Sequence, residues 1–431
     1  MNIHIRNTRL IDPATQTDKI TDILITDGKI TQIAQETDPR LLPENTRMID
    51  AAGMITAPGL TDVHVHFREP GFTHKEDIGT GAMAAAAGGY TTVVMMANTN
   101  PVTDSVAVMD SILGRIREVN LKTPLHILPS ASVTVGLKGQ TLTDFAALKA
   151  AGAVGFTDDG IPLMDEKLLE EAFLQAARLH CPVSLHEENP AMIAQNGINA
   201  GPVSQAFGLA GSPREAEISM IKRDLAIASR TEADVNIQHV STKEGVELIR
   251  QAKRNNPHIH AEATPHHFSL TQDAVHQYGT LAKMNPPLRT EEDRMAIIEG
   301  LSDGTIDLIA TDHAPHSAEE KARDFADAPS GIIGLETALS LGITKLVMPG
   351  YLTFSKLIER MSTAPAALYR IDHSVAEGKN ADLVLFSPEK VRTVSRFYSR
   401  SSNSPFLGQK LNGVVEYTIC DGKISYQNTE E

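Results

Sequence analysis

The sequence predicts an α/β fold in which a (β/α)8 TIM-type barrel carries a small β-rich domain formed by both chain ends. Three observations predict it. Short apolar, β-branched runs alternate with longer helical segments through the middle of the 431-residue chain, a pattern typical of parallel strands joined by helices. Eight such runs occur, the number that closes a barrel. The two ends of the chain contain short strands and turns instead.

The chain ends resemble each other and differ from the middle. Residues 1–56 alternate apolar and polar positions, and "TDILITDGKITQI" contains an Asp-Gly pair typical of a hairpin turn. Residues 367–431 show the same pattern in "ADLVLFSP" and "NGVVEYTICDGKISY". We therefore expect these two ends to pair in one small β domain, with residues 57–366 forming the barrel.

The eight predicted barrel strands are separated by helix-like segments such as Asp165–His180 and Pro213–Arg230. The strands are predicted at 62–67, 91–98, 125–132, 153–159, 183–188, 235–240, 259–265 and 307–313. In such a barrel the carboxyl ends of all strands meet at one mouth, where catalytic residues collect.

Histidines and aspartates recur at these strand ends. The first strand carries His64 and His66, which face the same side because they are two residues apart. Later strands add Asp158 and Asp159, then His186, then His239, then Asp312 and His313. Any one of these residues alone is more simply interpreted as a core, surface or turn residue. Six of them, four histidines and two carboxylates at one end of five strands, together favour a metal centre instead.

The size of this set predicts how many ions it holds. Four histidines and two carboxylates exceed the needs of one tetrahedral ion. They suit two borderline metals such as zinc that share one carboxylate. A water between two such ions would be partly ionised near neutral pH and could attack a carbonyl carbon.

Composition and charge argue against several other classes of function. The net charge of −15 disfavours nucleic acid and anionic membranes as partners. The two cysteines, Cys181 and Cys420, imply no disulfide framework. No apolar run approaches the ~20 residues that span a bilayer, and the N-terminus lacks the apolar core of a secretory signal. We therefore expect a cytoplasmic protein.

Several motifs resemble the amidohydrolase superfamily and, more closely, the class I dihydroorotases. They are "DVHVHFREPG", "MMANTNP", "GFTDDG", "LHEEN", "QHVSTKE", "TPHHFSLT", "KMNPPLR" and "ATDHAPH". The resemblance covers nearly the whole chain. It implies a cyclic amidohydrolase that reversibly converts N-carbamoyl-L-aspartate to L-dihydroorotate and water in de novo pyrimidine (UMP) biosynthesis. In the hydrolytic direction, a metal-bridging hydroxide would attack the ring amide, and Asp312 would act as general base and acid.

The resemblance also assigns the metal ligands. Two Zn²⁺ ions per chain are implied, although other divalent transition metals would fit. His64, His66 and Asp312 would hold one ion, and His186 and His239 the other. Asp159 would bridge both, with its neighbour Asp158 as the alternative. Many relatives bridge with a carboxylated lysine, but the fourth strand, "AVGFTDDG", contains no lysine.

The substrate carries a carboxylate, and Arg68 just beyond the first strand suits it, because a guanidinium binds a carboxylate with two hydrogen bonds. A loop cation or an ion pair with Glu69 or Asp62 is the simpler interpretation of Arg68. The resemblance implies further substrate contacts by His66, Asn98, Asn285, His316, Ser330 and Gly331. Asn98 could equally belong to a turn. Ser330 replaces the bulky residue that is usual in the family, so the sequence does not define what its side chain contributes to the pocket wall.

Two rival functions remain at this point. Hydantoinases and allantoinases share the ligands but resemble sequences with a lysine on the fourth strand. A metal-free scaffold that only supports aspartate transcarbamoylase would lack ligand histidines, whereas every ligand is present here. The expected partners are therefore the small-molecule substrate and a second copy in a homodimer, with association with aspartate transcarbamoylase left open. His266 and His267, after the seventh strand, could support the ligands, cap a helix or take a direct part in the site.

Overall fold

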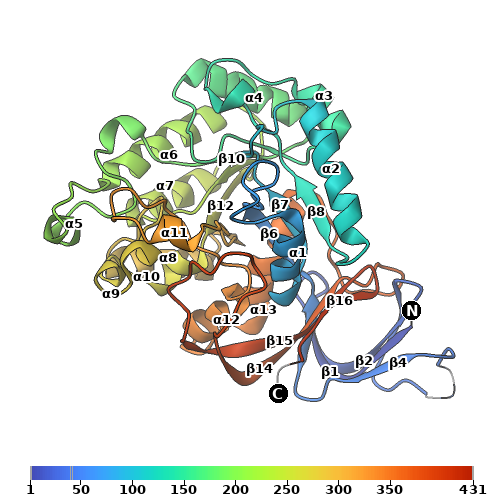
Figure 1. Ribbon diagram of the computed structural model, residues 1–431. Helices are drawn as coiled ribbons and strands as arrows, with labels where there is room; N and C mark the ends of the chain where they lie inside the picture. Colours follow the sequence, from blue (N-terminus) through green and yellow to red (C-terminus); the bar gives the residue numbers. More distant parts are fainter. Residues whose placement is uncertain (1, 39, 41, 430–431) are drawn as a thin grey trace.

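The computed structural model describes residues 2–38, 40 and 42–429, and it shows a barrel with a separate β sheet at one end (Figure 1). Parallel strands form the barrel, while strands from both chain ends form the second sheet. The predicted fold class is confirmed.

Eight parallel strands form the barrel. They pair as β6-β7-β8 and as β9-β10-β11-β12-β13. Parallel bridges between Ala131 and Phe156 and between Val65 and His313 join the two groups, which closes the ring. The strands are β6 (Leu60–Val65), β7 (Tyr90–Met95), β8 (His126–Pro129), β9 (Phe156–Thr157), β10 (Val183–Leu185), β11 (Val235–Ile237), β12 (Ile259–Ala263) and β13 (Leu308–Ile309). Every residue of β6, β7, β10 and β11 is buried, as expected for parallel strands covered on both faces.

Helices surround the barrel, and several of them begin at polar caps. Asp165 accepts hydrogen bonds from the first turn of α4, and Thr290 forms a capping box with Asp293 at the start of α10. The helices after successive strands are α1 (Ile78–Ala87), α2 (Val106–Asn120), α3 (Phe145–Ala151), α4 (Glu166–Arg178), α6 (Arg214–Ala228), α7 (Lys243–Lys253) and α10 (Glu291–Asp303). Shorter helices are α5 (Pro202–Ala206), α8 (Pro265–Ser269), α9 (Ala274–Tyr278), α11 (Ala318–Lys321), α12 (Ala338–Gly342), α13 (Phe354–Ile358) and α14 (Ala364–Leu368). Among the described residues, no helix combines the length and the apolar character needed to cross a membrane.

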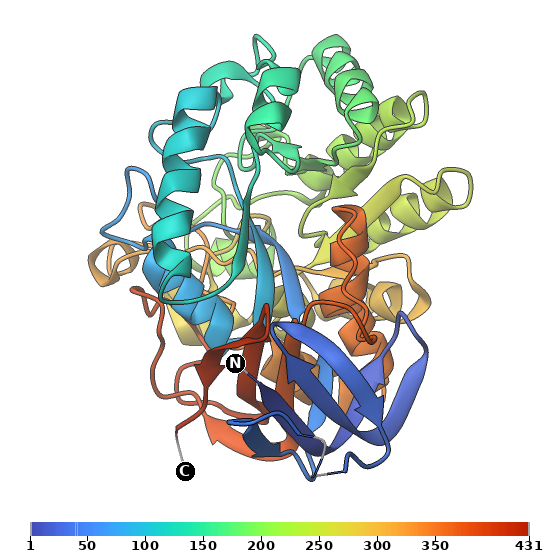
Figure 2. The ribbon, with the colours of Figure 1, turned by 90° about the vertical axis from the view of Figure 1, so that its right-hand side faces the viewer.

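The second sheet joins the two ends of the chain (Figure 2). Its strand order is β16-β15-β14-β5-β1-β2-β3, with β4 paired to β1. Strand β5 pairs in parallel with β1 and antiparallel with β14, so it connects the N-terminal and C-terminal strands. The strands are β1 (Ile3–Asp12), β2 (Thr17–Thr26), β3 (Lys29–Ala34), β4 (Arg47–Asp50), β5 (Ile55–Pro58), β14 (Leu383–Thr393), β15 (Lys410–Cys420) and β16 (Lys423–Gln427).

The small sheet has an apolar core of its own. Ile5, Ile23 and Leu383, from three different strands, are buried in it. The last sheet strand before the barrel ends at Pro58, and the first barrel strand begins at Leu60. The division into residues 1–56, 57–366 and 367–431 as independent units stays a prediction.

Candidate metal centre and active site

All six predicted metal ligands lie within a barrel strand or in the loop just after one. His64 is in β6 and His66 follows it, while His186 follows β10 directly. Asp159 and His239 lie two residues beyond β9 and β11, and Asp312 lies three beyond β13. The barrel geometry therefore brings residues from five strands to one mouth.

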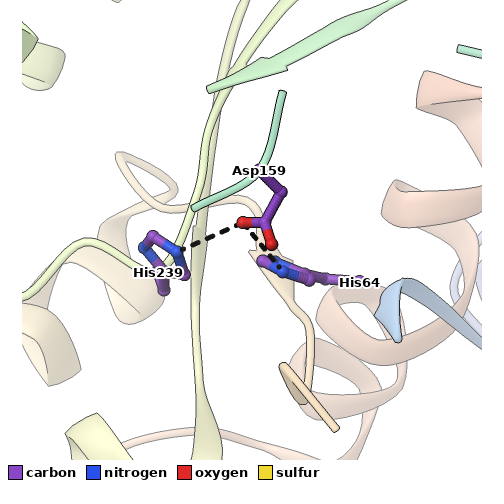
Figure 3. A group of neighbouring side chains, drawn as sticks. All are labelled: His64, Asp159 and His239. Atoms are coloured by element: carbon purple, nitrogen blue, oxygen red, sulfur yellow. Dashed lines mark ion pairs between the residues drawn. The ribbon is translucent and has the colours of Figure 1, made fainter. Parts of the chain in front are cut away.

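The imidazoles and carboxylates face one another at close range. Nε2 of His64 lies 3.4 Å from Oδ1 of Asp159 and 3.4 Å from Oδ1 of Asp312. Nε2 of His66 lies 3.1 Å from the same Asp312 oxygen. Nε2 of His239 points at Oδ1 of Asp159 from the other side, at 3.9 Å (Figure 3). Asp159 is thus the carboxylate between the two groups of histidines.

Two sets of side chains could each hold an ion. The potential ligand atoms of His64, His66 and Asp312 lie within 4.8 Å of one another, and so do those of His64, Asp159 and His239. His186 stands slightly apart, with Nδ1 at 3.0 Å from Nε2 of His239 and 3.9 Å from Oδ1 of Asp159.

The donor atoms fit a cation. Among the described residues, Nε2 of His64 and Oδ1 of Asp159 are buried and have no hydrogen-bond partner. Buried polar atoms are normally satisfied, so two orphaned atoms of this kind facing each other suit a bound ion. Imidazole nitrogens with carboxylate oxygens are a donor set typical of zinc and similar divalent metals.

Asp158 points away from this cluster. Its Oδ1 accepts hydrogen bonds from the backbone N–H groups of Val133 (2.7 Å) and Thr134 (3.1 Å), and its Oδ2 accepts one from the Thr134 hydroxyl. Burial raises the pKa of Asp158 to about 6 in spite of these hydrogen bonds. Its contacts assign Asp158 to the loop after β8, whereas Asp159 faces the histidines.

Two carboxylates that orient the histidines were missed by sequence reasoning. Oε1 of Glu262, on β12, lies 2.7 Å from Nδ1 of His64, and both side chains are fully buried. Oε2 of Glu188 lies 3.2 Å from Nε2 of His186. Carboxylates in this position fix the ring and raise the basicity of the other nitrogen. The signal for Glu262 was available, because an acid in the buried strand "IHAEATP" needs a partner.

A cavity of about 220 Å³ opens beside the cluster. It brings together all the predicted site residues except His64, which lies deeper. Its lining comprises His66, Arg68, Asn98, Asp159, Gly160, His186, His239, Asn285, Asp312, Ala314, His316, Ser330 and Gly331. Residues that follow β6 and β7, together with the three loops around 285, 316 and 330, thus line the same cavity as the ligands.

The contacts of Arg68 argue against an ion pair with Glu69 or Asp62. Its Nε donates to the backbone oxygen of Pro315 at 3.3 Å. Glu69 pairs with Arg115 at 3.3 Å, and Asp62 accepts from the backbone N–H groups of Thr311 and His64. Arg68 therefore lines the cavity without pairing to either acid.

The other predicted substrate contacts are linked to each other or to the ligands. The Asn98 amide joins two ligands, with Oδ1 at 3.0 Å from Nδ1 of His66 and Nδ2 donating to Asp159 at 3.1 Å. The Ser330 hydroxyl donates to Oδ1 of Asn285 at 3.0 Å. A small polar side chain at position 330 thus supports Asn285, where a bulky residue was the family expectation.

Backbone strain marks the site. Arg68, His239 and Asp312 have φ values of 60°, 35° and 48°, in the left-handed region that non-glycine residues rarely occupy. Such conformations cost roughly 1–3 kcal/mol each and concentrate at functional sites. The loops after β6, β11 and β13 therefore carry strain where they aim these side chains.

The environment keeps His316 neutral. Burial and then the nearby charge of Arg68 lower the pKa of His316 to about 2. Its Nε2 lies 2.9 Å from the backbone oxygen of Ser330, so that nitrogen carries the proton. A neutral imidazole contributes hydrogen bonding rather than charge to this side of the cavity.

Two other histidine groups have local explanations. His267 lies 2.8 Å through Nδ1 from the Thr264 hydroxyl, the cap of α8, and 3.0 Å through Nε2 from the backbone oxygen of Pro286. Between the barrel and the small sheet, His126 pairs with Asp382 at 3.2 Å beside Cys420. Burial raises the pKa of the Cys420 thiol, so this group is an ion pair beside a protonated thiol.

Sequence comparisons agree with the site. A family model described as dihydro-orotase-like matches residues 53–245. The chain is 50% identical over 427 residues to a protein of Clostridioides difficile (strain 630) named dihydroorotase, which covers 98% of this chain and 99% of that protein. It is 49% identical over 429 residues to a dihydroorotase of Lactococcus lactis subsp. lactis (strain IL1403), covering 99% and 100%.

Solved structures share the fold. The L-hydantoinase (dihydropyrimidinase) from Arthrobacter aurescens superposes with a TM-score of 0.87 at 26% identity, covering 99% of this chain and 96% of that chain. The dihydropyrimidinase from Brevibacillus agri NCHU1002 superposes with a TM-score of 0.83 at 22% identity, covering 100% and 96%.

The barrel, the small sheet and the histidine–aspartate mouth define a cyclic amidohydrolase. The relatives that are about 50% identical over nearly the whole chain narrow this class to the dihydroorotases. The chain belongs to the dihydroorotase family, and the predicted resemblance is confirmed.

Proposed function

We propose that this protein is a dihydroorotase that reversibly closes N-carbamoyl-L-aspartate to L-dihydroorotate with loss of water, a step of pyrimidine biosynthesis. The observation that carries the proposal is one cavity that combines the histidine–aspartate cluster with Arg68 and His316. Such a cavity suits a cyclic amide bearing a carboxylate. The full-length relatives named dihydroorotase support it.

We further propose that the metal part of the site would hold two divalent ions, with zinc as the proposed metal. His64, His66 and Asp312 would hold one ion, and His186 and His239 the other, with Asp159 shared between them. Two bound ions would polarise the amide carbonyl and lower the pKa of a water at the site. Metal analysis of active protein should give about two ions per chain. A metal content that never exceeds about one ion per chain would contradict the proposal that Asp159 is shared between two ions.

Asp312 is the proposed proton carrier. Its Oδ1 faces His66 at 3.1 Å, and the residue lines the cavity where the substrate would lie. In the hydrolytic direction it would take a proton from the attacking water and give it to the ring nitrogen as the C–N bond breaks. In the synthetic direction, it would take the carbamoyl N–H proton as that nitrogen attacks the side-chain carboxyl, and return it to the departing oxygen.

The substrate would be held by the other residues that line the cavity. Arg68, Asn98 and His316 would bind its carboxylate, and the guanidinium would supply two parallel hydrogen bonds. Asn285, which the Ser330 hydroxyl supports, and the backbone at Gly331 would contact the ring amide. The carboxylate end thereby fixes which ring carbonyl faces the cluster.

The deciding experiment is a three-substrate assay. Dihydroorotate, hydantoin and allantoin are offered to one preparation whose metal content is measured on the same sample. We expect turnover of dihydroorotate far above that of the other two rings. Preferred turnover of hydantoin would assign the chain instead to the activity that its structural neighbour's name describes.

Three further expectations stay predictions. They are a homodimer, an association with aspartate transcarbamoylase and a cytoplasmic location. The mass in solution, measured with and without a purified transcarbamoylase, tests the first two.

A further inference from the structure

Residues 394–409, between β14 and β15, leave the small sheet and pack on the barrel (Figure 1). Several short contacts hold this segment there. The backbone N–H of Tyr398 donates to Glu336 at 2.9 Å, and that of Arg400 donates to Glu76 at 3.0 Å. The Ser401 hydroxyl donates to the backbone oxygen of Lys75 at 2.6 Å. The segment therefore has a defined position relative to the barrel mouth.

Asn403, in this segment, makes three side-chain hydrogen bonds to two loops of the proposed substrate pocket. Its Oδ1 accepts from the backbone N–H of His316 at 3.1 Å. Its Nδ2 donates to the backbone oxygens of Ala314 (3.0 Å) and Gly331 (3.2 Å). The side chain is only 4% exposed, so these bonds are made away from water.

These bonds reach the proposed carboxylate site in a single further step. Ala314 and His316 flank Pro315, whose backbone oxygen accepts from Nε of Arg68 at 3.3 Å. The His316 ring also contacts the other loop, because its Nε2 lies 2.9 Å from the backbone oxygen of Ser330. Asn403 thus connects the loop that contains His316 to the loop that contains Gly331. Arg68 contacts the first of these loops through the backbone oxygen of Pro315. None of the three hydrogen bonds of Asn403 involves a proposed metal ligand.

We propose that Asn403 is a positioning residue for the carboxylate end of the substrate; this inference rests on the proposed dihydroorotase function. It acts through the backbone at 314–316 and 331 and touches no reacting atom. Only an amide supplies one acceptor and two donors in this arrangement. An aspartate there would lose both donations and set a buried carboxylate against two carbonyl oxygens.

The test compares Asn403→Asp with Asn412→Asp, the same chemical change on a partly exposed residue of β15. Metal content, thermal unfolding, kcat and KM are measured with dihydroorotate and with a cyclic amide that lacks the carboxylate. For Asn403→Asp we expect full metal content and a KM for dihydroorotate raised at least about tenfold, because buried polar groups are left unpaired. The fall in kcat should be smaller than the rise in KM, and the ring without a carboxylate should be affected less. Asn412→Asp should behave as wild type.

Asn403→Ser is the second variant, because it adds no charge to the site. It should show the same rise in KM with metal retained. A KM within about twofold of wild type in both variants would overturn the proposal, and so would metal loss parallel to the loss of activity or failure of both to fold. If the wild-type protein does not turn over dihydroorotate at all, the proposed function fails instead, which keeps the two failures distinct.

Discussion

Neighbouring aspartates at the end of β9 have opposite surroundings. Asp158 is bound by backbone N–H groups of the loop after β8, whereas Asp159 faces His64 and His239. From the sequence, both are candidates for the bridging ligand, and spacing to His186 favours Asp159 without excluding Asp158. At the scale of single residues, the direction of a side chain is set by the hydrogen-bond donors that happen to surround it.

Substituting each aspartate should separate the two roles. Asp159→Ala should lower metal content sharply, because its carboxylate faces both histidine groups. Asp158→Ala should retain metal but lose roughly 1–3 kcal/mol of stability, since two buried backbone N–H groups lose their acceptor. Metal analysis and urea unfolding of both variants test this. Greater metal loss in Asp158→Ala would move the bridge to that residue.

Arg68 should act on substrate and leave the metals in place. Arg68→Met should keep its metal but lose roughly 2–5 kcal/mol of productive dihydroorotate binding, the range for breaking a buried charge pair. A cyclic amide without the carboxylate should lose much less. The value of kcat/KM on both substrates measures the difference. Equal losses on both would show that Arg68 supports the fold or the metals.

At the scale of elements, several barrel strands are shorter than the apolar runs that predicted them. The run at 153–159 contributes only Phe156–Thr157 to β9, and the run at 307–313 only Leu308–Ile309 to β13. The residues of each run that follow the strand, 158–159 and 310–313, form buried loops at the mouth. Hydrophobic periodicity locates such an element but does not mark where strand pairing stops, because the run continues into a buried loop.

Contacts between elements explain Glu262, which the sequence did not single out. It lies on β12, and its partner His64 lies on β6. Glu262→Gln should keep the shape of the side chain but remove the negative charge beside the histidine. We expect metal affinity to fall about 10–100-fold, the usual cost of losing such an orienting carboxylate.

Chelator competition at equilibrium measures that affinity. Glu232→Gln, on an exposed residue before β11, is the matched control and should leave metal affinity unchanged. An unchanged affinity in Glu262→Gln would mean that His64 keeps its orientation without the charge of Glu262.

At the scale of the whole molecule, the segment between β14 and β15 also contacts the barrel. Glu336, in the barrel, accepts backbone hydrogen bonds from Tyr398 and Ser399. Burial raises the pKa of Glu336 to about 7 although these hydrogen bonds oppose the rise. The junction between the two parts of the chain therefore contains a carboxyl group that titrates in the physiological range.

This group should make stability depend on pH in a definite direction. The folded state holds the Glu336 proton more tightly than the unfolded state, whose pKa is near 4.5. Its contribution is present below that value and is lost as pH rises through about 7. Stability relative to Glu336→Gln should therefore fall by up to about 1.4 kcal/mol per pH unit across this window.

Urea unfolding between pH 5 and 8, at saturating metal, provides the comparison. Because both proteins bind the same metals, their pH dependence cancels in the difference. Glu389→Gln, on an exposed residue of β14, should run parallel to wild type. Parallel curves for wild type and Glu336→Gln would show that Glu336 is ionised in the folded protein throughout.

The sequence by itself determined the barrel, the pairing of the chain ends and the set of candidate ligands. Alternating runs, strand number and polar strand ends are local patterns, and the barrel converts their order into one mouth. Only the tertiary structure decided which aspartate faces the histidines, that Glu262 and Glu188 orient two of them, and that Asn403 reaches the substrate loops. Those contacts join residues from 2 to 198 positions apart, and no local periodicity encodes which distant side chain will satisfy a buried polar group.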